Sequence, residues 1–200
     1  MYTTEKTRVH LIRHGEVEGG PRYNGHNDVG LSPRGIEQYH QLKPRLDADR
    51  ISACYTSDLT RTVRGGEILG PYLGVEPVKM PGLREIGCGV WQGMTVPEIQ
   101  RTRPGEWEAR MADLMGFRAP GGETINEVAA RALPAMAEIV ERHRGEEVLV
   151  IAHGGVNRII LMSALGAPLS SMFSIEQSYC CMNVIDYYAD GNSVVKLLNG

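Results

Sequence analysis

The chain has 200 residues, of which 42% are hydrophobic, and a formal net charge of −3. This length suffices for one α/β domain with a substantial core. The weak negative charge excludes a global attraction to nucleic acid or to an anionic membrane, so any affinity for an anion must be local. The first fifteen residues contain no apolar stretch typical of a signal peptide, and no window reaches a membrane-spanning length.

The four cysteines show neither a metal-ligand spacing nor a convincing disulfide pattern. They are Cys54, Cys88, Cys180 and Cys181, and the adjacent pair is a poor candidate for a disulfide. We therefore expect a cytoplasmic protein with reduced thiols. The sequence carries no signal of an oligomeric state.

Segments typical of buried strands alternate with segments that have helical spacing of apolar residues. Strands are expected at residues 7–13, 51–56, 74–78, 148–152, 182–188 and 193–198, with a hairpin turn at 189–192. Helices are expected after Ser32-Pro33, from a Ser57-Asp58 cap to Gly70-Pro71, after a Thr124 cap, and from about Val156 to Leu165. This order predicts a single three-layer α/β domain over residues 1–200, with a mostly parallel central sheet and helices on both faces.

Residues 82–122 interrupt this alternation. The segment is rich in Gly, Pro, Met and Trp and has little periodicity. We expect an insertion that borders the ligand pocket. Trp91 and Trp107 lie in it, and either could stack on a base, although simple packing is the commoner role of tryptophan.

Two hydrophobic runs end on histidines. Residues 11–16 read Leu-Ile-Arg-His-Gly-Glu, and residues 148–155 read Val-Leu-Val-Ile-Ala-His-Gly-Gly. Each run predicts a buried strand that delivers a polar side chain at its carboxyl end, where open α/β sheets hold ligands. We therefore expect His14 and His153 to share a pocket.

The neighbours of these histidines are typical of an anion site. Arg13 offers a planar fork of donors for phosphate or carboxylate, and Gly15 allows a sharp turn close to a ligand. A neutral His14 can attack phosphorus, because nearby arginines disfavour its protonated form. Gly154 and Gly155 would open a helix whose unpaired N–H groups face the ligand.

Two further polar residues are candidates for the same site. Arg61, in the first turn of a helix, could reach back over the sheet edge, although most helix arginines are solvated. Ser57 is interpreted as a plain helix cap. Glu85 lies in a glycine-rich segment suited to a loop over a pocket, where a carboxylic acid could protonate a departing alkoxide.

In chain order, these motifs resemble those of the histidine phosphatase superfamily, also called phosphoglycerate mutase-like. The motifs are Arg13-His14-Gly15, Ser57…Arg61, Leu83-x-Glu85…Gly89-x-Trp91-x-Gly93 and His153-Gly154-Gly155. The resemblance covers nearly the whole chain and implies that His14 carries the phosphoryl group while Glu85 is the proton donor. The groups that it implies for holding the phosphoryl oxygens are Arg13, Arg61 and His153. It also implies a single α/β domain without a metal or cofactor, because guanidiniums and a helix end can supply the stabilising charge.

One position departs from the family pattern. Many members have an asparagine six residues after the nucleophile, where this chain has Gly20. The stretch from Tyr23 to Asp28 resembles the family segment that lines the phosphate site, and Asn24 and Gly25 match it best. With Gly154, they are the candidates for substrate binding, although Asn24-Gly25 could also be a simple turn. His26 could contact the substrate, but an exposed loop position is the simpler interpretation.

The member that the chain resembles most is α-ribazole phosphatase. The Arg-His-Gly-Glu-Val opening, the 23–28 run and the short chain support this resemblance. It implies removal of the 5′-phosphate from a nucleoside-like monoester in cobalamin biosynthesis. A cofactor-dependent phosphoglycerate mutase is an alternative, but such mutases carry a paired-arginine motif and this chain has no Arg-Arg. A broad-specificity sugar phosphatase also stays open, since the 84–123 segment sets specificity.

Two other classes of function remain. The pocket could bind a phospholigand without turning it over, although a binder gains nothing from a carboxylate such as Glu85 beside a phosphate. A zinc site built from His14, His153 and a carboxylate is possible by residue type, but arginines crowded beside a cation disfavour it. The expected partner is a small phosphomonoester, with no nucleic acid or membrane.

Overall fold

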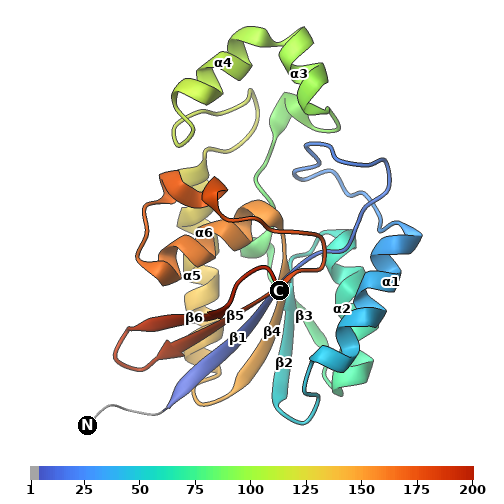
Figure 1. The fold of residues 1–200 in the computed structure, drawn as a ribbon, viewed down its shortest axis with the longest axis vertical. Coiled ribbons are helices and arrows are strands. Elements are labelled where there is room, and N and C mark those ends of the chain that lie inside the picture. Colours follow the sequence, from blue (N-terminus) through green and yellow to red (C-terminus); the bar gives the residue numbers. More distant parts are fainter. Residues whose placement is uncertain (1–4) are drawn as a thin grey trace.

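A six-stranded sheet forms the middle layer of the computed structural model, which describes residues 5–200 (Figure 1). Its strands, in chain order, are β1 (Lys6–Arg13), β2 (Ile51–Thr56), β3 (Pro77–Lys79), β4 (Glu147–Ala152), β5 (Met182–Tyr188) and β6 (Ser193–Leu197). The spatial order is β3-β2-β4-β1-β5-β6. The first four strands in this order are parallel, and β5 is antiparallel to both β1 and β6. The prediction of a mostly parallel sheet is confirmed.

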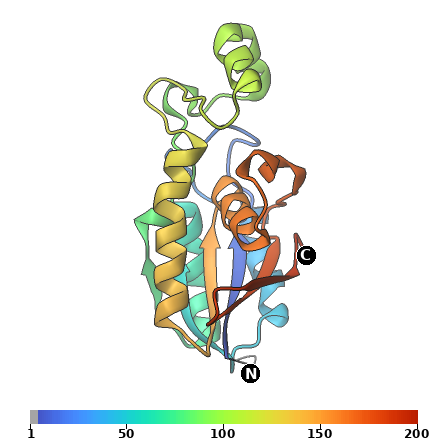
Figure 2. The ribbon, with the colours of Figure 1, turned by 90° about the vertical axis from the view of Figure 1, so that its left-hand side faces the viewer.

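Helices cover both faces of the sheet (Figures 1 and 2). The helices are α1 (Pro33–Leu42), α2 (Thr60–Leu73), α3 (Val96–Thr102), α4 (Pro104–Ala112), α5 (Ile125–Arg142) and α6 (Gly154–Leu165). Successive residues of a strand point to opposite faces. In β1, Ile12 therefore packs with Tyr39 of α1 and Leu69 of α2, whereas Leu11 packs with the α5 and α6 side, including Ile159. The three-layer α/β prediction is confirmed.

The predicted boundaries of α2 are wrong at both ends. The helix begins at Thr60 after Leu59, and no side chain caps it, because the Ser57 hydroxyl is bonded elsewhere. It also runs past Gly70-Pro71 to Leu73. A proline in the last turn leaves little helix to disrupt, and the end is instead formed by Gly74 in the left-handed conformation (φ 69°).

Two other boundaries differ for related reasons. Since Gly74 ends α2, the third strand covers Pro77–Lys79 rather than residues 74–78. The helix expected from Val156 begins at Gly154, directly after β4 and His153. The predicted Ser32 and Thr124 caps are confirmed, and Thr124 forms a reciprocal capping box with Glu127.

The 82–122 segment lies beyond the carboxyl ends of the parallel strands (Figures 1 and 2). It contains α3, α4 and a 3₁₀ helix at Gly89–Trp91, with a small hydrophobic cluster of its own around Trp91, Ile99 and Ala119. Further 3₁₀ helices lie at Lys43–Arg45, Pro81–Leu83 and Leu169–Ser174. Within residues 5–200, no helix combines the length and the apolar character needed to cross a membrane.

Candidate active site

The two predicted histidines converge at the carboxyl edge of the sheet. β1 and β4 are parallel neighbours with Arg13 opposite Ala152, so the residues that follow them lie side by side. The ring centroids of His14 and His153 are 5.2 Å apart. His14 is 6% exposed and His153 is fully buried. The sheet therefore delivers both rings to one site, as the two motifs predict.

His14 has the protonation state of a nucleophile. Its Nδ1 lies 2.8 Å from the Gly15 carbonyl oxygen, so Nδ1–H donates and Nε2 keeps its lone pair. Burial, reinforced by the charges of Arg61 and Arg13, lowers the pKa of His14 well below its ordinary value. The ring is therefore neutral at neutral pH, with one unprotonated nitrogen.

His153 is held by hydrogen bonds at both ring nitrogens. Arg61 donates from Nε to Nδ1 (3.3 Å), and Nε2–H donates to the Ser57 hydroxyl (2.7 Å). Ser57 Oγ lies 2.7 Å from Thr62 Oγ1, which donates to the Leu59 carbonyl. Burial, followed by the Arg61 charge, lowers the pKa of His153 well below its ordinary value. His153 is thus a neutral ring in a continuous hydrogen-bond chain.

The predicted role of Ser57 as a helix cap is wrong, because its hydroxyl bonds to His153 and no side chain caps α2. It follows the carboxyl end of β2, next to β4, and is fully buried. Its position after a strand end is the same signal that identified His14 and His153. Serine near the start of a helix is common as a cap, so the sequence pattern alone favours that role.

Arg61 lies under the loop that follows β1. It is 1% exposed and donates to the Asn27 carbonyl (2.8 Å) and the Gly25 carbonyl (2.7 Å). With the bond to His153, three of its five N–H donors are used, which leaves two for a ligand. Gly25 has φ 46°, and a Cβ there would lie 2.8 Å from the Cys88 nitrogen, so this close loop packing requires glycine.

Arg13 is held by the segment before β5. Its guanidinium stacks on Tyr179, 4.1 Å from the ring centroid, and donates to the Gln177 carbonyl. The Nε–H of Arg13 is buried and has no hydrogen-bond partner within residues 5–200. A buried donor without a partner suits an anionic ligand. Tyr179 also contacts the His14 ring, with centroids 5.7 Å apart, and no sequence pattern indicated it.

Glu85 reaches the same edge from the insertion. Its carboxylate accepts hydrogen bonds from the Ile86 N–H (2.9 Å) and, at the start of α6, the Gly155 N–H (3.1 Å). A Cβ at Gly155 would lie 2.5 Å from Glu85 Oε1, so the approach requires glycine. A carboxylate thus lies on the edge that holds the histidines.

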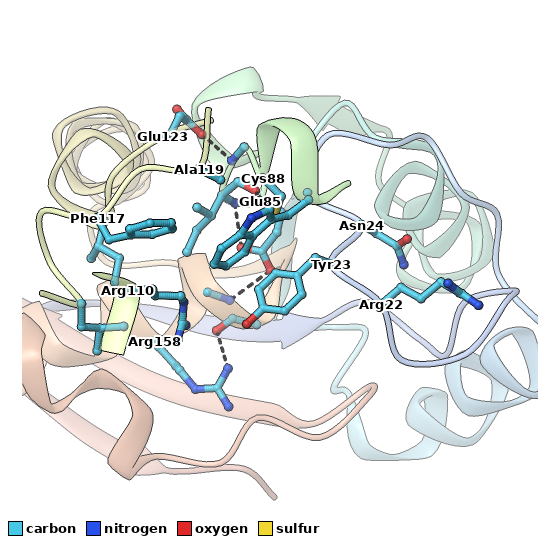
Figure 3. A pocket seen from close by; sticks show the side chains of 18 of the residues that line it. Arg22, Tyr23, Asn24, Glu85, Cys88, Arg110, Phe117, Ala119, Glu123 and Arg158 are labelled. Atoms are coloured by element: carbon cyan, nitrogen blue, oxygen red, sulfur yellow. Dashed lines mark hydrogen bonds between the residues drawn. The ribbon is translucent and has the colours of Figure 1, made fainter. Parts of the chain in front are cut away.

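A cavity of about 230 Å³ opens over this edge (Figure 3). Arg13, Glu85, Gly154 and Gly155 line its inner part. The remaining walls include residues of the loop after β1, of the insertion, of α6 and of the segment after it, namely Arg22, Tyr23, Asn24, Gly25, Trp91, Arg110, Phe117, Arg158 and Phe173. His14, Arg61 and His153 do not line this cavity in the described chain and are buried beside it. Asn24, Gly25 and Gly154, the predicted binding residues, line this cavity, whereas Gly20 is an exposed loop residue.

Two arginines in the cavity wall were not predicted. The guanidinium carbons of Arg110 and Arg158 each lie 5.5 Å from the Phe173 ring centroid. Arg158 donates to the Ile175 and Gly154 carbonyls. Neither arginine forms an ion pair with a carboxylate in the described part of the chain, and both face the cavity (Figure 3). The position of Arg158, one helical turn after Gly154, indicates in the sequence that it faces the same site. No sequence pattern indicates Arg110.

The zinc site considered as an alternative has no set of ligands in the described part of the chain. Among residues 5–200, no three His, Cys, Asp or Glu side chains lie together in an arrangement that could hold an ion. The four cysteines are free thiols, and burial raises the pKa of Cys54 and Cys88 to about 12.

Comparison with known proteins defines the class. Residues 9–200 match the histidine phosphatase superfamily (branch 1), and the chain belongs to this family of phosphatases and mutases. Bacillus stearothermophilus YhfR superposes with a TM-score of 0.87 at 30% identity, with 96% of each chain covered. The α-ribazole phosphatase from Shigella flexneri has the same fold, with a TM-score of 0.87, 24% identity and 96% of each chain covered. The probable phosphoglycerate mutase GpmB of Yersinia pestis (strain Pestoides F) is 28% identical over 183 residues, which is 90% of this chain and 85% of that protein.

Proposed function

We propose that the chain is a phosphomonoester hydrolase that works through a phosphohistidine intermediate, without a metal or cofactor. The observation that carries this proposal is the state of His14, a neutral ring with a free Nε2 beside two arginines. A binding protein would need the arginines but not an unprotonated nitrogen beside them. Glu85 on the same edge supports an enzyme in particular.

In the first step, His14 Nε2 donates its lone pair to phosphorus while the phosphorus–ester oxygen bond breaks. Glu85 gives its proton to the departing oxygen, so that an alcohol leaves rather than an alkoxide. The free donors of Arg13 and Arg61 bind the phosphoryl oxygens. Such acid catalysis contributes about 10²–10⁴-fold to the rate, and the arginines supply the charge stabilisation that a metal gives elsewhere.

In the second step, water attacks phosphorus and the phosphorus–nitrogen bond breaks. The Glu85 carboxylate takes the water proton, and His14 recovers its lone pair as inorganic phosphate leaves. His153 contributes through its Nδ1, which in this structure accepts a hydrogen bond from Arg61. A bound phosphate dianion favours the protonated ring, which would then donate from Nδ1 to a phosphoryl oxygen while keeping Ser57 on Nε2.

The substrate that we propose is α-ribazole 5′-phosphate, in cobalamin biosynthesis and in the cytoplasm. The 13–17 and 23–28 motifs support this choice. The aromatic side of the cavity, with the partly exposed Tyr23 and Phe117, offers faces on which a base could stack. Free thiols at all four cysteines are typical of a reducing compartment.

A second candidate is a phosphomonoester with another anionic group, such as a phosphoglycerate. Arg110 and Arg158 favour it, because each is a cation in the cavity wall without a carboxylate partner in residues 5–200. Arginine binds a carboxylate through paired hydrogen bonds. The 28% identity to a probable phosphoglycerate mutase agrees with this candidate.

Hydrolysis of p-nitrophenyl phosphate, with and without a chelator, tests the reaction class. We expect phosphate release that a chelator does not change. A panel of α-ribazole 5′-phosphate, 3-phosphoglycerate with bisphosphoglycerate, and simple sugar phosphates then tests the substrate, and we expect the highest kcat/KM for the first. Tight phosphate binding without turnover of any compound would indicate a phospholigand-binding module. Loss of activity with the chelator would contradict the metal-free mechanism.

A further inference from the structure

The backbone that carries Glu85 is held by two side chains outside the reacting groups. Arg131 of α5 donates from Nη1 to the carbonyls of Gly82 (2.9 Å) and Arg84 (2.7 Å). Its Nη2 donates to the carbonyl of Glu85 itself (2.9 Å). His26, from the loop after β1, donates from Nε2 to that same carbonyl (2.8 Å). The Glu85 peptide therefore has donors from two distant parts of the chain.

Glu123 fixes Arg131 and the other side of the segment. Its two carboxylate oxygens accept from Nε and Nη2 of Arg131, both at 2.8 Å, and it accepts the Gly87 N–H at 2.7 Å. Burial opposes the ionised form of Glu123, but the hydrogen bonds from Arg131 and Gly87 hold its pKa below the ordinary value. A two-point pair of this kind fixes the plane of the guanidinium. The backbone is thus tied on both sides of Glu85.

The segment has no regular structure that could fix it otherwise. Residues 84–87 belong to no helix or strand, and they lie near the start of the insertion. A general acid must lie within hydrogen-bond distance of the oxygen that it protonates. A misplacement of about 1 Å can cost on the order of 10²-fold in rate. The position of the Glu85 carboxyl group therefore depends on the bonds to its own peptide.

We propose that Arg131, together with His26, is a positioning residue that sets the Glu85 carboxyl group against the leaving oxygen. Arg131 does not line the cavity in the described chain, so it acts through Glu85 rather than on the substrate. This inference rests on the proposed function, because it requires Glu85 to be the general acid. Figure 3 shows Glu85 and Glu123 at the cavity that this segment borders.

The dependence of the rate on the leaving group tests the inference. Arg131→Lys keeps the charge but cannot reach three carbonyls and a carboxylate at once. p-Nitrophenolate leaves without a proton, whereas the alkoxide of butyl phosphate needs one. We expect kcat/KM for butyl phosphate to fall about tenfold or more, and that for p-nitrophenyl phosphate to fall less than about threefold. Arg142→Lys, which alters an exposed ion pair with Glu138 on the same helix, should change neither.

Glu85→Gln separates this inference from the proposed function. It should show the same leaving-group pattern more strongly, and Arg131→Lys should lose nothing further in the Glu85→Gln background. If Glu85→Gln lowers both substrates equally, the proposed role of Glu85 fails. If Glu85→Gln shows the pattern but Arg131→Lys lowers both substrates equally, or neither, the positioning role of Arg131 is overturned.

A second variant covers the case in which Arg131→Lys does not fold, which circular dichroism and thermal unfolding would reveal. His26 lies in a partly exposed loop, so His26→Ala removes one donor to the Glu85 carbonyl at little risk to the fold. We expect a smaller loss confined to butyl phosphate. Equal losses on both substrates, or none on either, in the folded His26→Ala protein would then overturn the inference.

Discussion

The sheet edge and the insertion contribute to one cavity in different ways. At the sheet edge the polar groups are buried and bonded to the protein, and Arg61 is only 1% exposed. In the insertion, Arg110 is partly exposed and forms no ion pair within the described residues. A rigid scaffold with variable loops is the usual arrangement when one chemistry serves different substrates. We infer that the edge, together with Glu85, sets the reaction and that residues 89–121 of the insertion set the substrate.

Removal of the nucleophile should have the largest effect and should be the same for every substrate. His14→Ala is expected to lower kcat on the order of 10⁶-fold, as loss of a covalent nucleophile does elsewhere. The measurement is phosphate release from p-nitrophenyl phosphate and from α-ribazole 5′-phosphate, with circular dichroism to check the fold. Substantial turnover of either compound by the folded variant would remove the nucleophile assignment.

Gly155→Ala tests the point where the two regions meet. The added Cβ would lie 2.5 Å from Glu85 Oε1, so the carboxylate must move. We expect kcat for an alkyl phosphate to fall about 10²-fold, the typical result of a small misplacement. Gly105→Ala in α4 is the matched control, because a Cβ there meets nothing within 4 Å. An unchanged kcat in Gly155→Ala would mean that the Glu85 position does not matter.

Arg110→Met tests whether the insertion selects the substrate. If the true substrate carries a second anion, loss of a charged hydrogen bond should raise its KM about tenfold. The KM for α-ribazole 5′-phosphate should change less than about twofold, as is usual for a surface substitution. Steady-state kinetics on α-ribazole 5′-phosphate and on 3-phosphoglycerate, which carries a second anion, measure the difference in KM. A large, uniform fall in kcat would contradict the division of roles between the two regions.

The smallest effect on turnover is expected when the pH is lowered from 7 to 6.5. Because the pKa of His14 is lowered by burial and by the neighbouring arginines, its ring should stay neutral at pH 6.5, where a free imidazole is about half protonated. Nitrogen NMR should show the Nδ1–H tautomer at that pH. Below it, the unfolded chain takes up a proton that the folded state does not, so the unfolding free energy should fall by about 1.4 kcal/mol per pH unit for this ring. A half-protonated His14 at pH 6.5 in the folded protein would contradict the burial argument.

The strands were predictable because burial leaves a strong pattern. β2 and β5 have the predicted bounds, and β1 differs by one residue. Apolar residues recur through these short segments and turn residues bound them, which is typical of strands. Helix ends were harder, because a cap is a local signal that tertiary contacts can override. Ser57 bonds to His153 across the sheet edge, and α2 therefore begins without it.

The five candidate catalytic residues could be placed from the sequence because each belongs to a motif beside a strand end or in the glycine-rich loop. Arg131 and Tyr179 could not be read in this way, since their roles come from contacts with distant segments. The insertion offered one unused signal, the Thr95…Glu98 capping box that starts α3. The position of Arg110 depends on how α4 packs, which the irregular segment does not encode locally.

The small cluster around Trp91 has a consequence for evolution and engineering. It shares no buried residue with the two clusters that pack on the sheet. An isolated antiparallel β-bridge pairs the backbones of Cys88 and Gly122 at the base of the insertion. Recombination between relatives at this base would exchange residues 89–121, which bond to Tyr23 of the loop after β1, and would leave the bonds of Arg131 to the Glu85 segment in place. New specificities could thus arise by transplanting one segment, without redesign of the catalytic apparatus.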